Sequence, residues 1–269
     1  YLRVYTRWEV LIMYHVHRIH AFSDNYIWAL VGNQNKCAIV DPGEAKPVLA
    51  TLANNSWELT EILLTHHHPD HIGGVKQLVE AFPNARVVGP DAPRFSQLAE
   101  PVFENGRIRL EATGSILNVT HLFGHTRDHI GYFDDQNVFV GDTLFSIGCG
   151  RLFEGTAVQL FESLQKLKSL PDTINVYCAH EYTLSNLEFA LTVEPDNPAL
   201  RQYQLEVADL LANGESSIPT TIGREKKLNP FLRAGTGELK QAVQHKFNLS
   251  AEPDELQSFT LLRQWKDSF

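Results

Sequence analysis

The sequence predicts a layered α/β domain followed by a mainly helical domain. Up to about residue 182, apolar runs with the spacing of strands alternate with runs that have the spacing of helices. Several of the strand-like runs end in histidine or aspartate, which indicates a site at one edge of a sheet. From residue 183 onward, amphipathic helical patterns separated by prolines replace this alternation.

The strands of the first domain are expected where short apolar or alternating runs are bounded by turn residues. These runs lie at 15–20, 25–31, 37–40, 59–64, 86–89, 116–122, 130–133, 138–140 and 174–178. Helices are expected where apolar residues recur every three or four positions. These patterns lie at 47–54, 73–82, 157–170, 184–193, 198–212, 237–247 and 252–265. The predicted domains are therefore 13–182 and 183–269.

Residues 1–12 are expected to be a non-native or upstream extension, because the only methionine of the chain is Met13. A processed targeting peptide is the alternative interpretation. The segment lacks the long apolar region and the small-residue cleavage site of a secretory signal.

Composition narrows the range of partners. The 23 basic and 32 acidic residues leave a net charge of -9, which argues against nucleic acid because phosphate recognition needs a basic face. No apolar run approaches the roughly 18 residues of a membrane span, so no membrane partner is expected. The three cysteines, an odd number without C-x-x-C spacing, favour a reducing compartment. A cytoplasmic monomer is the expectation.

The run L-L-T-H-H-H-P-D-H-I-G-G at 63–74 places four metal-binding side chains directly after an apolar strand. They are His66, His68, Asp70 and His71. Alternate residues of an extended segment point the same way, so His66 and His68 are expected to project together while His67 points elsewhere. Imidazole nitrogen and carboxylate oxygen suit zinc or a similar first-row ion. A surface histidine cluster is the alternative, but it would not lie between a buried strand and a helix start.

Three further strands end in candidate ligands, which are His125 in G-H-T, Asp142 in G-D-T and His180 in A-H-E-Y. A single catalytic zinc needs three protein ligands, so the full set of seven fits two ions. We expect two groups of three ligands and one bridge: His66, His68 and His125; Asp70, His71 and His180; and Asp142. Two ions about 3.5–4 Å apart can share a water whose pKa falls toward roughly 7, which supplies hydroxide at neutral pH.

Some residues near these motifs have two interpretations. Asp41, in the turn after the strand at 37–40, is either a carboxylate that supports the histidine loop or an aspartate at an ordinary turn, and the local sequence favours neither. His129 either hydrogen-bonds near the site or fills the core, and the core is favoured. Cys149 and Cys178 are expected to pack rather than to act as nucleophiles.

Together these motifs resemble the metallo-β-lactamase superfamily, in which T-H-H-H-P-D-H, G-H-T, G-D-T and A-H-E-Y occur in this order. Three longer stretches are similar to one family within it, glyoxalase II, the hydroxyacylglutathione hydrolases. They are D-N-Y-I-W at 24–28, G-D-T-L-F-S-I-G-C-G-R-L-F-E-G-T at 141–156 and C-A-H-E-Y-T at 178–183. The similarity covers nearly the whole chain from about Met13.

The resemblance implies an αββα sandwich followed by a helical substrate-binding domain. The implied reaction is hydrolysis of S-D-lactoylglutathione, or a related 2-hydroxyacylglutathione, to D-lactate and glutathione, the second step of methylglyoxal detoxification. The resemblance implies two divalent ions, zinc first and iron or manganese as alternatives, held by the seven ligands. Asp70 and Asp142 are then the catalytic residues, and a metal-bound hydroxide is the nucleophile that attacks the thioester. Substrate contacts are implied for Arg151, Phe153, His180, Tyr182, Arg263 and Lys266.

Three positions depart from the family pattern. Phe153 stands where some members have tyrosine, so a hydroxyl contact to glutathione is absent. Asp128 interrupts the usual G-H-T-x-G-H run and adds a carboxylate near the metal ligands. Pro69 stiffens the ligand loop and removes an N–H donor, whereas Gly73 and Gly74 are expected to let the chain turn tightly into the next helix.

Rival functions within the superfamily are those of a β-lactamase, a lactonase and a persulfide dioxygenase. A β-lactamase would need an export signal, which is not visible, and a dioxygenase would need one iron with fewer ligands. A non-catalytic metal-binding module is the alternative from a different class of function. Measuring the metal content together with thioester hydrolysis distinguishes the hydrolase from the non-catalytic module.

Overall fold

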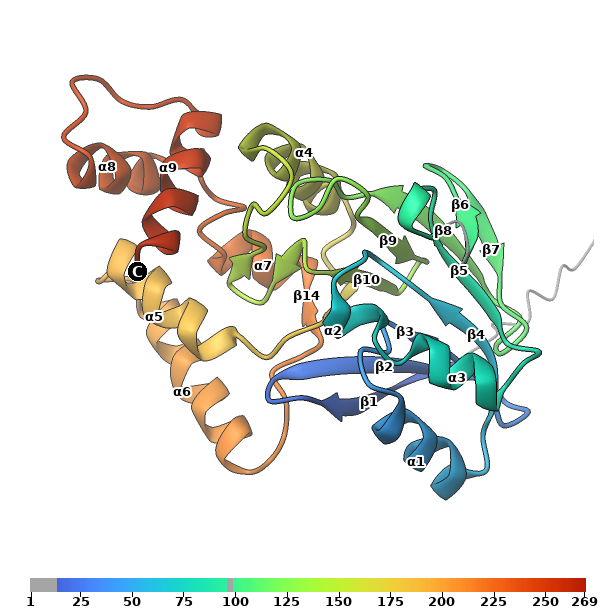
Figure 1. Cartoon of the computed structure of the whole chain (residues 1–269). Helices are drawn as coiled ribbons and strands as arrows, with labels where there is room; N and C mark the ends of the chain where they lie inside the picture. Colours follow the sequence, from blue (N-terminus) through green and yellow to red (C-terminus); the bar gives the residue numbers. More distant parts are fainter. Residues whose placement is uncertain (1–13, 96–98) are drawn as a thin grey trace, which may run out of the picture.

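The computed structural model describes residues 14–95 and 99–269, so the extension expected at 1–12 lies outside the described residues. Two six-stranded sheets pack face to face (Figure 1). The first sheet has the strand order β1 (His15–Ala21), β2 (Asn25–Val31), β3 (Lys36–Val40), β4 (Glu58–Leu63), β5 (Arg86–Pro90) and β6 (Glu100–Val102). The second has the order β14 (Thr220–Thr221), β13 (Asn175–Cys178), β10 (Asn137–Gly141), β9 (Ile130–Phe133), β8 (Ile116–His121) and β7 (Arg107–Arg109).

Strand β2 shows how the first sheet is covered on both faces, because all seven of its residues are buried. Trp28 and Leu30 belong to the core between the sheets. Ile27 and Ala29 point the other way and pack with residues of two outer helices, α1 (Ala45–Asn55) and α3 (Val75–Ala81). A strand buried on both faces has a nearly continuous apolar sequence, which explains N-Y-I-W-A-L-V.

Helix α4 (Ala157–Lys168) supplies the fourth layer, beside the second sheet. Its Leu160, Leu164 and Leu167 are buried in the same cluster as that sheet, and a capping box between Thr156 and Gln159 fixes where it begins. The predicted αββα architecture is therefore confirmed.

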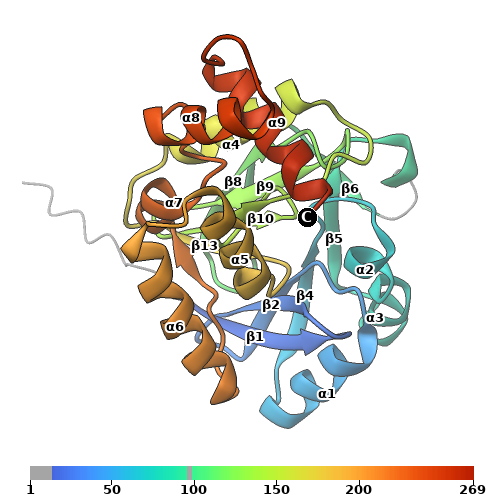
Figure 2. The ribbon, with the colours of Figure 1, turned by 90° about the vertical axis from the view of Figure 1, so that its left-hand side faces the viewer.

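The helices after β13 gather on one side of the sandwich, where Figure 2 shows them facing the viewer. They are α5 (Thr183–Val193), α6 (Pro198–Ala212), α7 (Ile222–Leu228), α8 (Gly237–Lys246) and α9 (Glu255–Asp267). Phe259 and Leu262 of α9 lie in the same buried cluster as the second sheet. The helical segment thus packs directly on the sandwich. Among the described residues, no helix is both long and apolar enough to cross a membrane.

Several short elements were not predicted, because two to seven residues carry too little periodicity. They are β6, β7, the hairpin of β11 (Leu144–Phe145) and β12 (Gly148–Cys149), β14, α7 and the single turn α2 (Pro69–Ile72). Pro69 begins α2, where its missing N–H costs nothing because the first helical amides have no partner within the helix.

Gly73 and Gly74 were expected to let the chain turn tightly, and this expectation was wrong. Both have right-handed helical backbones, with φ of -60° and -84°, which any residue can adopt. What they provide is space, since a Cβ on Gly73 would lie 2.7 Å from the carbonyl oxygen of Gly43 and one on Gly74 2.5 Å from the amide nitrogen of Ala45. The ligand loop can therefore lie directly against the turn that follows β3.

Strands β3 and β4 run parallel, as do β10 and β13, and β8 has the direction of β10 because each is antiparallel to β9. Within each sheet these strands end at one common edge. The loops that follow carry the candidate ligands and Asp41.

Candidate metal centre

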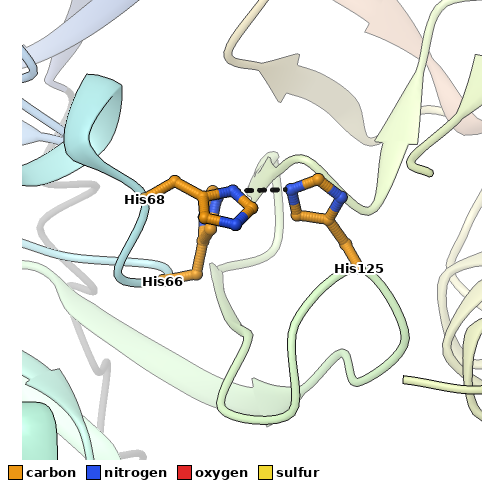
Figure 3. Close-up of side chains that lie close together, drawn as sticks. All are labelled: His66, His68 and His125. Atoms are coloured by element: carbon orange, nitrogen blue, oxygen red, sulfur yellow. Dashed lines mark hydrogen bonds between the residues drawn. The ribbon is translucent and has the colours of Figure 1, made fainter. Parts of the chain in front are cut away.

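His66, His68 and His125 bring their imidazole rings together at one edge of the sandwich, as Figure 3 shows. The Nδ1 atom of His68 lies 3.1 Å from Nε2 of His66 and 3.0 Å from Nε2 of His125. Two of these residues follow β4 of the first sheet, whereas His125 follows β8 of the second. Three ring nitrogens that converge in this way can bind one cation.

Asp70, His71 and His180 form a second group, and one ligand atom from each lies within 4.8 Å of the others. Asp70 Oδ2 lies 3.5 Å from Nε2 of His71 and 3.4 Å from Nε2 of His180. The turn of α2 places the first two side chains, and His180 follows β13.

Asp142, which follows β10, lies between the two groups. Its Oδ2 is 3.4 Å from Nε2 of His125, and its Oδ1 is 3.4 Å from Nε2 of His71 and 3.5 Å from Nε2 of His180. The structure thus brings all seven predicted ligands together, with one carboxylate oxygen of Asp142 facing each group.

Two buried polar atoms at this point, His71 Nε2 and Asp142 Oδ1, have no hydrogen-bond partner. Leaving such atoms unsatisfied costs about 1–3 kcal/mol each, so they are rare in native proteins. A cation between them would satisfy both. The residues present therefore fit the pair of divalent ions that the sequence implies.

The electrostatics of the two groups differ. Burial lowers the pKa of His66, His68 and His125, so these imidazoles are neutral, which is the form that binds metal. Burial opposes protonation of His180 as well, but the carboxylates of Asp142, Asp70 and Asp24 raise its pKa to about 10. The carboxylate-rich group thus attracts positive charge, which a divalent ion would supply.

Residues behind the ligands fix the orientation of two of them. Asp41 is buried and accepts hydrogen bonds from the backbone N–H and hydroxyl of Thr65, at 2.8 and 2.6 Å, while its Oδ2 lies 3.0 Å from Nδ1 of His71. Asp24 lies 2.8 Å from Nδ1 of His180 in the same way. A carboxylate on the far nitrogen of an imidazole holds the ring in place and increases its basicity. The supporting interpretation of Asp41 is therefore the correct one.

The preference for a purely core role of His129 was wrong. The ring is fully buried, but its Nε2 accepts a hydrogen bond from the backbone N–H of Asp142 at 3.1 Å. It therefore holds the backbone that carries the bridging carboxylate. The sequence analysis did not identify two further supporting residues, Asp24 and Asn25, although they begin the D-N-Y-I-W motif. Nδ2 of Asn25 donates a hydrogen bond to Oδ2 of Asp70 at 3.0 Å.

A cavity of about 450 Å³ adjoins His125 and Asp142 and extends to the helical segment. The predicted substrate residues that line it are Arg151, Phe153, Tyr182, Arg263 and Lys266. Phe145, Cys149, Ser185 and Asn186 also line the cavity, and sequence reasoning did not assign them to the site. The lining of this cavity therefore combines two metal ligands with three cationic side chains.

The predicted substrate residues have different environments. Arg263 is buried, its Nη1 donates to the carbonyl of Cys149 at 2.9 Å, and its Nη2 pairs with Asp267 at 2.8 Å. The ring of Tyr182 stacks on His180 with 4.6 Å between centroids. Phe153 is 64% exposed and lies edge-on to the rings of His68 and His125. Arg263 thus shapes the cavity wall, and the two aromatic rings flank the metal ligands.

Comparison with known proteins agrees with this arrangement. The metallo-beta-lactamase superfamily profile matches residues 24–180, and the profile described as the hydroxyacylglutathione hydrolase C-terminus matches residues 181–269. The hydroxyacylglutathione hydrolase of Aliivibrio salmonicida is 54% identical over 251 residues, which are 93% of this chain and 98% of that protein.

Solved structures share the fold. ETHE1 from Myxococcus xanthus superposes with a TM-score of 0.62 at 24% identity, covering 96% of this chain and all of that one. TTHA1623, solved in a di-iron-bound form, gives a TM-score of 0.57 at 26% identity over 81% of this chain and all of that one. Because both profiles match in sequence and the relative is similar over almost its full length, the chain belongs to the hydroxyacylglutathione hydrolases of the metallo-β-lactamase superfamily.

Proposed function

We propose that this chain hydrolyses S-D-lactoylglutathione and related S-2-hydroxyacylglutathiones to the 2-hydroxy acid and glutathione, the second step of methylglyoxal detoxification. The observation that carries the proposal is the cavity that joins the seven-ligand centre to Arg151, Arg263 and Lys266. Glutathione presents carboxylates, which guanidinium and ammonium groups bind well. Its thioester carbonyl can then lie beside the metal ligands.

The proposed cofactor is a pair of divalent ions, zinc first, with iron or manganese as alternatives, in the two groups bridged by Asp142. The donor set of imidazole and carboxylate accepts all three metals, and TTHA1623 was solved with two irons. When bound, such ions lower the pKa of a shared water and attract developing negative charge on a carbonyl oxygen.

The chain's own residues position the reactants. Asp142 and Asp70 serve as the catalytic carboxylates, because the oxygens of Asp142 lie near imidazoles of both groups and Oδ2 of Asp70 lies near His71 and His180. The rings of Tyr182 and Phe153 lie against the imidazoles of His180 and His68 and flank the ligands beside the cavity. Water gives up a proton and adds its oxygen to the thioester carbon, the carbon–sulfur bond breaks, and glutathione leaves as a thiolate that takes up a proton from solvent. The 2-hydroxy acid is released as its carboxylate. A thiol pKa near 8.5 makes this departure possible without a strong general acid.

The helical segment 183–269 is proposed as the substrate-binding domain. Helix α9 supplies Arg263 and Lys266 to the cavity wall, whereas Arg151 comes from the loop after β12 and is exposed. Arg263 already donates to the carbonyl of Cys149 and pairs with Asp267, whereas Lys266 donates to the carbonyl of Ser185 at 3.0 Å and keeps two further N–H donors. We therefore propose Arg151 and Lys266 as the main cations that bind the ligand.

Lys266 provides a pH test of substrate binding. Burial, together with the nearby Arg263, lowers the pKa of Lys266 to about 8. Its positive charge is therefore present at pH 7 and is lost as the pH rises through about 8. We expect the KM of the parent to increase between pH 7 and 9 while kcat changes less. Lys266→Ala should raise KM about 10–150-fold at pH 7, since a hydrogen bond to a charged group is worth about 1.5–3 kcal/mol.

Lys266→Arg is the matched control, because arginine keeps its charge throughout this range. Its KM should stay flat where that of the parent rises. If the KM of Lys266→Arg rises as steeply as that of the parent, Lys266 does not bind the substrate.

Turnover by the purified chain tests the proposed function. S-D-lactoylglutathione should release one thiol for each D-lactate, a chelator should stop the reaction, and added zinc should restore it. A lactone, a β-lactam and glutathione persulfide with oxygen serve as comparison substrates. Two bound ions without thiol release, or faster turnover of a comparison substrate, would refute the proposal.

A cytoplasmic monomer is proposed as well. All three cysteines are unpaired and buried in the described part of the chain, which suits a reducing compartment. Light scattering after size exclusion measures the oligomeric state directly.

A further inference from the structure

The side chain of His67 points away from its two ligand neighbours into a cluster of its own. Its Nδ1 lies 3.1 Å from each carboxylate oxygen of Asp128, and its Nε2 lies 3.3 Å from Oε1 of Glu154. Because successive residues of an extended segment point in opposite directions, fixing His67 on one side also fixes where His66 and His68 point on the other.

Asp128 and Glu154 are in turn tied to the loop that carries His125. Asp128 is only 8% exposed and accepts a hydrogen bond from the hydroxyl of Thr126 at 2.7 Å. Glu154 accepts from the backbone N–H of Arg127 at 3.2 Å, and its own N–H donates to the carbonyl of His125 at 3.3 Å. The cluster therefore connects the loops that supply all three ligands of the His66, His68 and His125 group.

The cluster also meets a positive charge. Arg94 places its Nη1 3.2 Å from Glu154 and its Nε 3.7 Å from Asp128. A third metal ion bound by His67, Asp128 and Glu154 would face this guanidinium at close range. The contacts instead connect the loops to one another, and each carboxylate already has a cationic or hydrogen-bonding partner.

We propose that Asp128 is a positioning residue that holds the His66, His68 and His125 group in the geometry of one metal site through its contact with His67. The proposal deepens the proposed function and rests on it, since it concerns one of the two ions that function requires. Asp128 touches neither ion nor substrate in this role. Its loss should therefore weaken one metal site and leave the Asp70, His71 and His180 group intact.

Stepwise cobalt(II) titration of the metal-free protein, followed by absorbance, tests this role separately from activity. Residues that directly support a metal ligand contribute about 10–100-fold to affinity, and Asp128 acts one contact further out, so Asp128→Ala should weaken one of two binding steps by about tenfold. His125→Ala and His180→Ala, which each remove one ligand from a different group, give the reference spectra that identify the weakened site. Glu104→Ala is the matched control, because it removes a carboxylate beside His121, which is not a ligand.

Two further variants, Asp128→Asn and His67→Ala, distinguish the loss of this contact from a general folding defect. Asparagine can accept from Thr126 and from an imidazole N–H, so Asp128→Asn should recover most of the affinity. His67→Ala should weaken the same step, and adding it to Asp128→Ala should weaken that step little further, because both remove one contact.

Each remaining outcome overturns the proposal. Two undisturbed binding steps in Asp128→Ala would show that the site does not depend on this carboxylate. Equal weakening of both binding steps, or strictly additive effects of the two substitutions, would indicate a general loss of structure and not the loss of one contact between Asp128 and His67. If the parent itself binds fewer than two ions, the proposed function fails, and this inference fails with it.

Discussion

Replacement of Asp142 by alanine is expected to reduce kcat/KM for S-D-lactoylglutathione by about 10³-fold or more, since metal ions contribute several kcal/mol to such reactions. Asp142 is the one residue among the described ligands whose two oxygens face both histidine groups. Its removal deprives both ions of their shared ligand. The measurement combines thiol release with the metal content of the purified variant, which should fall below that of the parent.

Asp172→Ala is a suitable control for the Asp142 substitution. Asp172 has a 70% exposed side chain that pairs with Lys226, and its removal should leave turnover and metal content unchanged. If Asp142→Ala retains two ions and works within tenfold of the parent, the two groups do not act as one bridged centre.

Replacement of Asp41 by alanine is expected to lower the free energy of unfolding by about 3 kcal/mol or more, because three buried groups lose their partner. They are the backbone N–H and hydroxyl of Thr65 and Nδ1 of His71. Asp41 also has a left-handed backbone with φ of 52°, which costs alanine about 1 kcal/mol more than aspartate. Urea unfolding measures the loss, and zinc affinity should fall about 10–100-fold as His71 loses its support.

Asp41→Asn separates these contributions. Asparagine tolerates the left-handed backbone and can still accept from Thr65, so most of the stability should return. Zinc affinity should recover less, because an amide is a weaker partner for His71 than a carboxylate. Equal stability of Asp41→Ala and the parent would mean that Asp41 occupies an ordinary turn.

The metal ligands could be predicted from the sequence because five of them lie within five residues of a strand end and the other two, Asp70 and His71, complete the motif after β4. His66 and His68 show their common direction through the two-residue period, and His125, Asp142 and His180 follow apolar runs that are easy to recognise. Their convergence needs only that the strands end at a common edge. The αββα fold, in contrast, was implied by resemblance, because periodicity alone does not determine how two sheets face each other.

The supporting residues could not be predicted with the same certainty. Asp41 reaches Thr65 across 24 positions and His129 reaches Asp142 across 13, and no local pattern distinguishes such contacts from a turn or a core histidine. The same holds for Asp128, whose partner His67 lies 61 positions away. The need for glycine at position 74 also depends on the tertiary structure, since the nearby backbone belongs to the turn between β3 and α1 and to the first residue of α1.

The candidate ligands come from both halves of the sandwich. His66, His68, Asp70 and His71 follow β4 of the first sheet, whereas His125, Asp142 and His180 follow strands of the second. Neither sheet alone carries all three ligands of either group, so bound ions would link the two sheets to each other. Free metal at 100 times its dissociation constant would then stabilise the folded chain by about 2.7 kcal/mol per site. The supply of metal in the cell would govern how long the protein survives as well as how fast it works.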